Sequence, residues 1–245
     1  MHDADPDQYR DYIRNTFGIT NVTWYTLPED AEAKLIELGF DPMIVTFELK
    51  ANEWINSSGG EIDIGIQLSI LEFESGGGSN IGNCDGLNSA ASFSQQEYSS
   101  ALWLLNYWEN HNIRDWSETA EFAVDSNYSN YIGHCCAGEI GPNAILPSTG
   151  VNICQNGLST HDDIMVRSCN FFDYRVAPYA KVWWLKAIGY KSSQSYEEKM
   201  LSLFGWNQSE EYRNMYITRA DEINQSLADF DFEPVQDEYY VFSGN

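Results

Sequence analysis

The sequence predicts a mainly α-helical protein. Apolar residues recur at helical spacing in several segments, and most of these segments begin at a residue that caps helices and end at a glycine. Apolar residues make up 43% of the 245 residues and aromatic residues 14%, which is enough for a folded core despite a formal charge of −24. We find no internal repeat and no linker rich in proline and serine, so we expect one main domain with an N-terminal helical extension.

Four helices are expected before residue 76. Asp5-Pro6 begins the first and Asp41-Pro42 the third, because aspartate caps a helix N-terminus and proline fits the first turn. Glycines end the first two helices, and three glycines at 76–78 end the fourth, which is densely apolar. We expect these helices at residues 5–18, 28–39, 41–56 and 62–73.

Five further helices are expected in the rest of the chain, at residues 95–110, 117–122, 178–189, 195–204 and 210–227. Proline in the first turn begins the third of these, and Ser195 with two glutamates caps the fourth. No periodicity organises residues 133–157, although Pro147 would begin an element there. The acidic and aromatic tail after Asp229 is expected to be extended and to pack on the chain's own body.

The charge excludes two classes of partner. The chain has 37 acidic residues against 13 Lys and Arg, and it lacks the basic clusters that bind nucleic acid or anionic membranes. No segment approaches the roughly 20 apolar residues of a membrane span, and residues 1–6 lack the pattern of a signal peptide. The acidity itself leaves three explanations open: a high-salt habitat, solubility, or a cationic partner.

The cysteines indicate disulfides or buried thiols rather than zinc. Their one close pair is adjacent and does not have the spacing of a zinc site. The five cysteines, whose pairing the sequence leaves open, are Cys84, Cys135, Cys136, Cys154 and Cys169. We expect no metal site and no cofactor, since His161-Asp162-Asp163 is more typical of a solvated turn than of a cation site.

Glu74 is the candidate catalytic residue. It lies at the C-terminal end of an apolar helix, where the helix dipole disfavours a negative charge. Partial burial would also raise its pKa, which keeps a carboxylic acid protonated for general acid catalysis. A glutamate before a glycine turn is also a common solvated helix end.

Two other segments contain residues suited to binding a polymer. The glycines of residues 137–149 allow a close approach to the backbone, although an ordinary connection has the same composition. In residues 203–209, Trp206 stands beside Asn207. An aromatic ring beside an amide is typical of carbohydrate sites and equally of a helix end.

Together and in this order, the three segments resemble the lytic transglycosylase family of the lysozyme-like superfamily. That family carries a Glu-Ser at a helix end, here Glu74-Ser75, a Gly-x-Met/Ile-Gly-x-x-Gln-x-x-Pro-Ser run, here Gly138 to Ser148, and an Ala-Tyr-Asn element, here Gly205-Trp206-Asn207. The long interval before the second motif resembles the branch with a helical insertion. The resemblance covers roughly residues 40–225.

The resemblance implies a fold and an activity. It implies a lysozyme-like single domain at residues 40–228, after a helical extension at 1–39 and before the acidic tail at 229–245. It also implies cleavage of the β-1,4 bond between N-acetylmuramic acid and N-acetylglucosamine in peptidoglycan, leaving a 1,6-anhydro end. Glu74 would be the only catalytic carboxylate, and the substrate-binding residues would be Ser75, Ile140, Gly141, Trp206 and Asn207. Such a protein is extracellular, cell-envelope or virion-associated.

Ala144 stands where the family has glutamine, so an amide that would contact an acetamido sugar is missing. Two alternatives to an active transglycosylase therefore remain. The first is a catalytically weak or inactive lysozyme-like module that serves as a surface, filament or virion subunit and self-associates. The second is a hydrolase that acts on a related polysaccharide such as chitin or pseudomurein.

Overall fold

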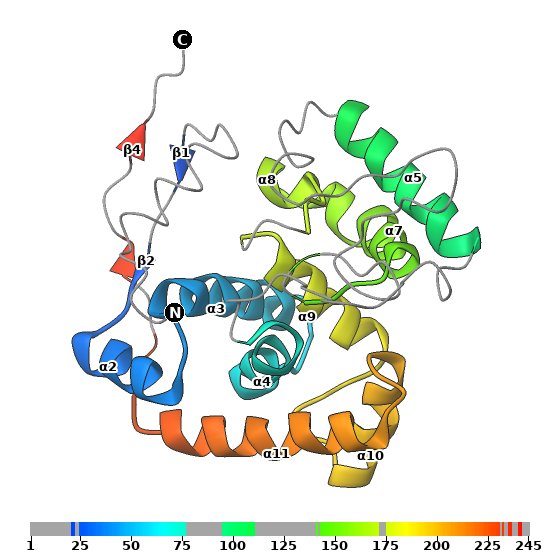
Figure 1. The fold of residues 1–245 in the computed structure, drawn as a ribbon. Coiled ribbons are helices and arrows are strands. Elements are labelled where there is room, and N and C mark those ends of the chain that lie inside the picture. Colours follow the sequence, from blue (N-terminus) through cyan, green and yellow to red (C-terminus); the bar gives the residue numbers. More distant parts are fainter. Residues whose placement is uncertain are drawn as a thin grey trace.

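Helices make up most of the structure, a computed structural model that describes residues 21–22, 25–76, 95–110, 141, 143–171, 175–230, 232, 235–236 and 240–241. The α-helices are α2 (Glu29–Leu38), α3 (Pro42–Ser57), α4 (Ile64–Ser75), α5 (Gln95–Asn110), α7 (Pro147–Asn156), α8 (Ile164–Arg167), α9 (Ala177–Ala187), α10 (Tyr196–Ser202) and α11 (Glu210–Leu227). Two short 3-10 helices, η2 (Leu158–Thr160) and η3 (Leu203–Gly205), follow α7 and α10. The mainly α class is confirmed (Figure 1).

Several residues that were expected to begin or end helices do so in the structure. The Asp41 side chain accepts a hydrogen bond from Met43 N at the start of α3, and Ser195 forms a reciprocal capping box with Glu198 at the start of α10. Gly39 and Gly76 end α2 and α4 in the left-handed conformation. The expected helices at 28–39, 41–56, 62–73, 95–110, 178–189, 195–204 and 210–227 are confirmed to within a few residues. Those at 5–18 and 117–122 lie outside the described residues.

Helix α7 begins at Pro147, where the sequence predicted the start of an element, within a stretch that no periodicity was expected to organise. Its sequence, PSTGVNICQN, has few large apolar residues with which to pack against the rest of the core. Packing and a covalent bond compensate for this. Gly150 lies so close to Phe171 that an added Cβ would come within 2.8 Å of the ring, and a disulfide joins Cys154 to Cys169 beyond α8.

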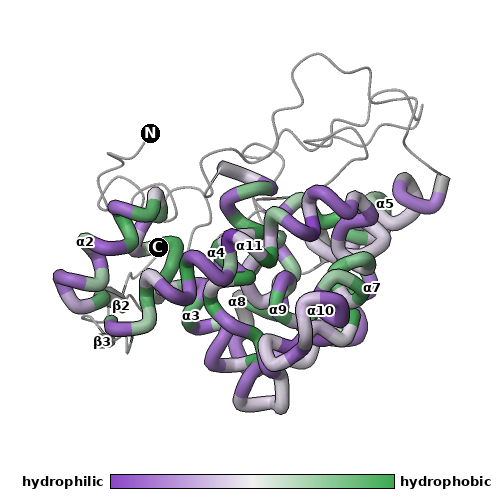
Figure 2. The backbone as a smooth tube through the Cα atoms, turned by 90° about the horizontal axis from the view of Figure 1, so that it is seen from below, coloured by the Kyte–Doolittle hydropathy of each residue, from purple (hydrophilic) through white to green (hydrophobic). Residues whose placement is uncertain are grey.

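Helix α4 forms the centre of the structure. Figure 1 shows α4 between α3 and α11, with α11 running along the edge of the molecule. Most of α4 is buried, including Ile66, Leu68 and Ile70. In contrast, α10 has no buried residue, and Figure 2 shows it as a hydrophilic segment. A helix buried on nearly all sides holds its C-terminal residues, Glu74 among them, in a fixed place.

Gly65 allows α4 and α11 to approach closely. A Cβ built on this residue would lie 2.4 Å from the carbonyl oxygen of Ala220 on α11. The two helices are further joined by the Ser69 hydroxyl, which donates to the carbonyl of Tyr216 (2.9 Å). The Asn224 side chain accepts from Gly65 N (2.9 Å), so both ends of the contact are hydrogen-bonded.

Three helices also meet at one buried ion pair. Lys181 on α9 donates to Glu48 on α3 (2.6 Å), and the side chains of both are excluded from solvent. The same ammonium donates to the carbonyl of Gln67 on α4 (2.9 Å). Charged side chains are seldom this deeply buried without a partner, and here the pair satisfies both.

Short strands join the two ends of the described chain. Strands β1 (Asn21–Val22) and β2 (Tyr25–Thr26) pair antiparallel with β4 (Tyr240–Val241) and β3 (Val235–Gln236), respectively. Most of the tail after residue 229 lies outside the described residues, so its extended form stays a prediction, as do the domain boundaries. No helix in the described part of the chain is long and apolar enough to cross a membrane.

Gly65→Ala is expected to lower the free energy of unfolding by about 1–3 kcal/mol, because the added methyl forces α4 and α11 apart. Alanine is the better helix former by about 1 kcal/mol, so propensity alone predicts the opposite sign. Urea unfolding measures the change. Gln225→Ala, an exposed change on α11, is the control and should change stability by less than about 0.5 kcal/mol. A stabilised Gly65→Ala variant would contradict the close approach.

Candidate active site

Glu74 lies in the last turn of α4, and its side chain is partly buried. Gly76, two residues after Glu74, ends the helix with a φ of +60°, a conformation that favours glycine. The residues around the carboxylate come from α11 and from the loop between η3 and α11. The candidate acid is therefore held by one helix and faced by a second.

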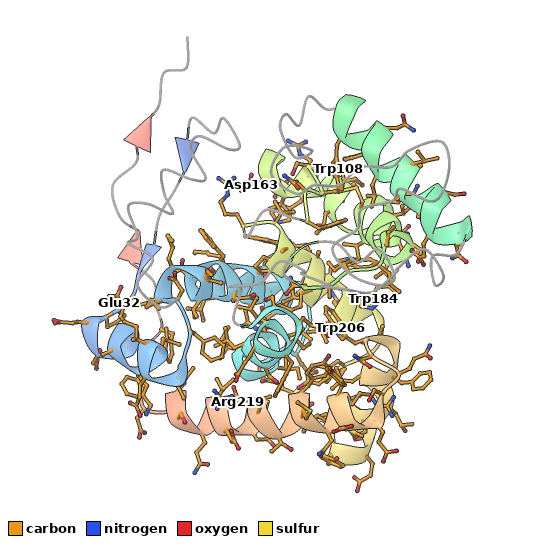
Figure 3. The ribbon with its side chains drawn as sticks, in the orientation of Figure 1. Glu32, Trp108, Asp163, Trp184, Trp206 and Arg219 are labelled. Atoms are coloured by element: carbon orange, nitrogen blue, oxygen red, sulfur yellow. A yellow bond between two sulfur atoms is a disulfide. The ribbon has the colours of Figure 1, made fainter. Side chains whose placement is uncertain are left out.

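Two donors hold one oxygen of the Glu74 carboxylate. The indole Nε1 of Trp206 donates to Oε1 (3.3 Å), and the hydroxyl of Tyr216 donates to the same oxygen. Figure 3 labels Trp206, which lies in the interior of the view above α11. Within the described part of the chain, no hydrogen bond reaches Oε2. The arrangement fixes the carboxylate through one oxygen and leaves the other available.

Burial raises the pKa of Glu74 above its ordinary value. The hydrogen bonds from Tyr216 and Trp206 and the positive charge of Lys181 act in the opposite direction, because each favours the ionised form. Burial and the adjacent carboxylate raise the pKa of Tyr216, so its hydroxyl keeps its proton and stays a donor. Glu74 therefore has the environment of a carboxyl that keeps its proton to higher pH than an exposed glutamate does, as a general acid requires.

Tyr216 is a site residue that the sequence did not indicate. It is fully buried on α11, its ring packs against Phe73 (5.9 Å between centroids), and its hydroxyl accepts from the Asn207 amide (3.3 Å). The only signal in the sequence was its place on the apolar side of a predicted helix, four residues after Tyr212. Tyr216 comes close to Glu74 because that helix packs against α4, and local sequence patterns do not reveal this tertiary contact.

Trp206 and Asn207 are held by the turn that follows η3. Both backbone amides donate to the carbonyl of Leu203 (2.9 Å each), and the Asn207 side chain accepts from Ser209 N (2.9 Å). The Asn207 amide therefore bonds to protein groups at both of its ends. The structure brings Trp206 into contact with Glu74 and places Asn207 one hydrogen bond further away, behind Tyr216.

Glu72, the nearest other carboxylate in the sequence, is bound elsewhere. It forms an ion pair with Arg219 on α11 (2.8 Å), and this guanidinium also donates to the carbonyl of Leu38 (3.2 Å). Glu72 and Glu74 thus both reach α11, but they bind residues three positions apart. The ion pair gives Glu72 a structural partner of its own.

Ser75 and the second motif have different surroundings. Ser75 is buried, and its hydroxyl donates to the carbonyl of Leu71 in the preceding turn (2.9 Å). Gly141 is buried, and its carbonyl accepts from Ala144 N (3.0 Å) in a turn where both residues have positive φ. No hydrogen bond joins Gly141 to Glu74 among the described residues, and Ile140 lies outside them.

The amide next to Ala144 is turned into the protein. Asn143 is buried, and its Nδ2 donates to the carbonyl of Ala177 at the start of α9 (2.9 Å). Its Oδ1 has no hydrogen-bond partner among the described residues. Asn143 therefore anchors the second motif to α9.

Glu97 fixes the helix that follows the second motif. Helix α7 lacks a side-chain cap of its own. The Glu97 carboxylate on α5 accepts from both the backbone N (2.8 Å) and the hydroxyl (2.5 Å) of Ser148, and a carboxylate is favourable at a helix N-terminus. Hydrogen bonds to α5 and α9 thereby fix the position of the second motif.

The described residues hold no group of three or more His, Cys, Asp or Glu that could bind a metal ion. His161 uses its Nδ1 to accept from Asp163 N (3.0 Å), and its ring packs against Trp54 and Tyr179.

Comparison with known proteins finds a lytic transglycosylase among the solved structures. It is the Escherichia coli lytic transglycosylase Slt35 in complex with bulgecin A, with 13% sequence identity and a TM-score of 0.45, over 92% of this chain and 80% of that chain. No protein-family model and no curated protein matches the sequence. We therefore derive a function from the side chains around Glu74 rather than from this similarity.

Tyr216→Phe is expected to raise the pKa of Glu74 further, because it removes a hydrogen bond that favours the ionised carboxylate. The signal of the Glu74 side-chain carboxyl in ¹³C NMR, assigned by comparison with Glu74→Gln, measures the change across a pH titration. Tyr212→Phe is the control, since that hydroxyl lies on the same helix but is not a donor to Glu74. An unchanged titration in Tyr216→Phe would show that the hydroxyl does not hold the acid.

Proposed function

We propose that the protein is a peptidoglycan lytic transglycosylase with Glu74 as its single acid and base. The observation that carries this proposal is the state of the Glu74 carboxyl. Burial raises its pKa, Trp206 and Tyr216 hold Oε1, and Oε2 receives no hydrogen bond from the described residues. The three-motif resemblance supplies the substrate and the reaction.

In the first step, Glu74 Oε2 donates its proton to the glycosidic oxygen while the bond from that oxygen to C1 of the muramyl residue breaks. In the second step, the Glu74 carboxylate takes the proton of the muramyl 6-hydroxyl, and the 6-oxygen forms the new bond to C1. The acid recovers its proton, no water is consumed, and the product carries a 1,6-anhydro end. A second catalytic carboxylate, as used by most glycosidases, is not required.

Trp206 and Tyr216 support both steps. Their hydrogen bonds strengthen when Glu74 is charged, so they stabilise the carboxylate that forms after the first transfer. Asn207 donates to the Tyr216 hydroxyl and orients its proton towards Glu74. Ser75, Ile140, Gly141, Trp206 and Asn207 remain the proposed substrate-binding residues. The arginine partner of Glu72 agrees with a mechanism that uses one carboxylate.

The Cys154–Cys169 disulfide supports a location outside the reducing cytosol, because such bonds persist in oxidising compartments. We place the proposed activity in the extracellular space, the cell envelope or a virion. In these locations the protein would encounter the glycan of a cell wall.

A second candidate function is a lysozyme-like binding or assembly module. The second motif favours it, because Ala144 carries no amide and the neighbouring Asn143 amide bonds to Ala177 instead. A site that lacks this contact binds an acetamido sugar less well, by about 1–3 kcal/mol.

Glu74→Gln is expected to lower the rate of peptidoglycan cleavage by about 10²–10⁴-fold, because the amide can neither donate nor take the proton. Mass spectrometry of the soluble products measures this and separates anhydro ends from reducing ends. Glu211→Gln, an exposed change near the start of α11, is the control and should cleave normally. Reducing ends would identify a hydrolase, and an uncleaved substrate with regular self-assembly would favour the second candidate.

Cleavage is expected to decline as pH rises through the raised pKa of Glu74, because a general acid must hold its proton. Since burial raises that pKa, the acid form persists to higher pH than in an exposed glutamate, whose pKa is about 4.3. The initial rate of glycan cleavage across the pH range at constant ionic strength tests this. A decline centred at or below the ordinary glutamate value would contradict the proposed role of burial.

A further inference from the structure

Lys181 is a charged group in the interior that the proposed mechanism does not use. Its side chain is 0% exposed and that of its partner Glu48 is 1% exposed. The ammonium donates to Glu48 Oε1 (2.6 Å) and to the carbonyl of Gln67 (2.9 Å). With its amide oxygen facing Asn52, Gln67 also donates to the second oxygen of Glu48 (3.0 Å). The ammonium is thus fixed in position.

The hydrogen bond from the Lys181 ammonium to the Gln67 carbonyl holds this charge against α4, the helix that carries Glu74. Seven residues separate Gln67 from Glu74, which is nearly two turns, so the two lie on the same side of α4. Backbone carbonyls of a helix point towards its C-terminus, and the ammonium bonded to Gln67 therefore lies on the Glu74 side of that residue. The separation along the axis is roughly 5–10 Å.

Among the described residues, few other charges act on Glu74 or Lys181. Glu74 is faced by Tyr216 from α11 and by Trp206 from the loop after η3, both as neutral donors, and by Lys181 from α9. Lys181 is faced by Glu48 from α3 and by Glu74 from α4. Lys181 is the one cation in this set, and its interaction with Glu74 passes through the protein interior, where solvent screens it little.

We propose that Lys181 is a positioning residue of the active site, whose buried ammonium, fixed by Glu48 and Gln67, offsets from inside the protein the negative charge that Glu74 acquires when it gives up its proton. Its use in catalysis rests on the function proposed above, but the charge coupling to Glu74 does not. Burial raises the pKa of Glu74, and the interior cation offsets part of this rise. The ammonium does so while its hydrogen bonds go to Glu48 and Gln67 rather than to the Glu74 carboxylate.

The effect of burial and of the ion pair on the pKa of these groups agrees with this geometry. Lys181 lowers the pKa of Glu74, and Glu74 in turn raises the pKa of Lys181, against the desolvation that lowers it. Removing the ammonium therefore raises the pKa of Glu74. The sign is the same whether Glu48 is then ionised or protonated, because an ionised Glu48 would repel the Glu74 carboxylate.

Two variants separate this role from a purely structural one. Lys181→Met removes the cation and leaves Glu48 buried without its partner. The double variant Glu48→Gln/Lys181→Met removes both charges and leaves no buried carboxylate unpaired, so it keeps the fold where the single variant fails. Lys191→Met is the matched control, since that lysine pairs with Glu61 at the surface (2.9 Å).

The experiment is a pH titration of the Glu74 carboxyl by ¹³C NMR in the full chain, with thermal unfolding measured beside it. The double variant is expected to show the Glu74 titration displaced to higher pH, because Lys181 is among the groups that shift the pKa of Glu74 and Glu48 is not. The expected ionisation constant is about threefold to tenfold lower than in the wild type. Lys191→Met should titrate as the wild type does. An undisplaced titration in a folded double variant, or an equal displacement in the control, overturns the proposal.

Glycan cleavage by the same variants distinguishes this inference from the proposed function. If the wild type cleaves peptidoglycan and the decline of its rate with pH moves upwards in the double variant, both stand. If the titration moves but no protein cleaves any glycan, the coupling stands and the proposed function fails. If cleavage occurs and neither the titration nor the decline moves, the function stands and Lys181 only joins three helices.

Discussion

The structure depends on a charge pair from which water is excluded. Lys181 and Glu48 lie where α3, α4 and α9 meet, and removal of either partner leaves the other buried without its ion-pair partner. Such a loss costs about 3–5 kcal/mol, whereas replacing both partners by apolar groups of similar size is often neutral. The pair therefore fixes how the three helices fit together more than it stabilises the folded state.

Helix α4 connects this pair to the candidate acid. One side of the helix accepts the Lys181 ammonium at Gln67, the Gly65 side lies against α11, and the last turn presents Glu74 to Tyr216. Because α4 is buried along most of its length, it cannot rotate to move Glu74 into solvent without exposing apolar side chains. The raised pKa of Glu74 and the bonds to Oε1 are both consequences of this packing.

Local signals in the sequence predicted most helices, since caps such as Asp41 and Ser195 and the periodicity of residues 210–227 act within a few residues. For helix α7 only the start at Pro147 was predicted, because Phe171, Glu97 and the disulfide that stabilise the helix are distant in sequence. Glu74 and Trp206 were predicted from motifs, and the structure brings them together. Tyr216 and Lys181 carry no local signal, because only the packing of α4 against α11 and α9 places them near Glu74.

The structure shows how some of the few cations in this acidic chain are used. Within the part of the chain that the structure describes, several cations form ion pairs with carboxylates of the chain itself, among them Lys34, Lys50, Lys181, Lys191 and Arg219. Cations bound in this way do little to attract an anionic polymer. A wall glycan with acidic substituents would be repelled at low ionic strength, whereas roughly 1 M salt shortens the range of repulsion to about 3 Å. The cleavage proposed for Glu74 is thus compatible with the −24 charge where the glycan is largely uncharged or the medium is salty, so the charge limits which glycans the proposed activity could reach.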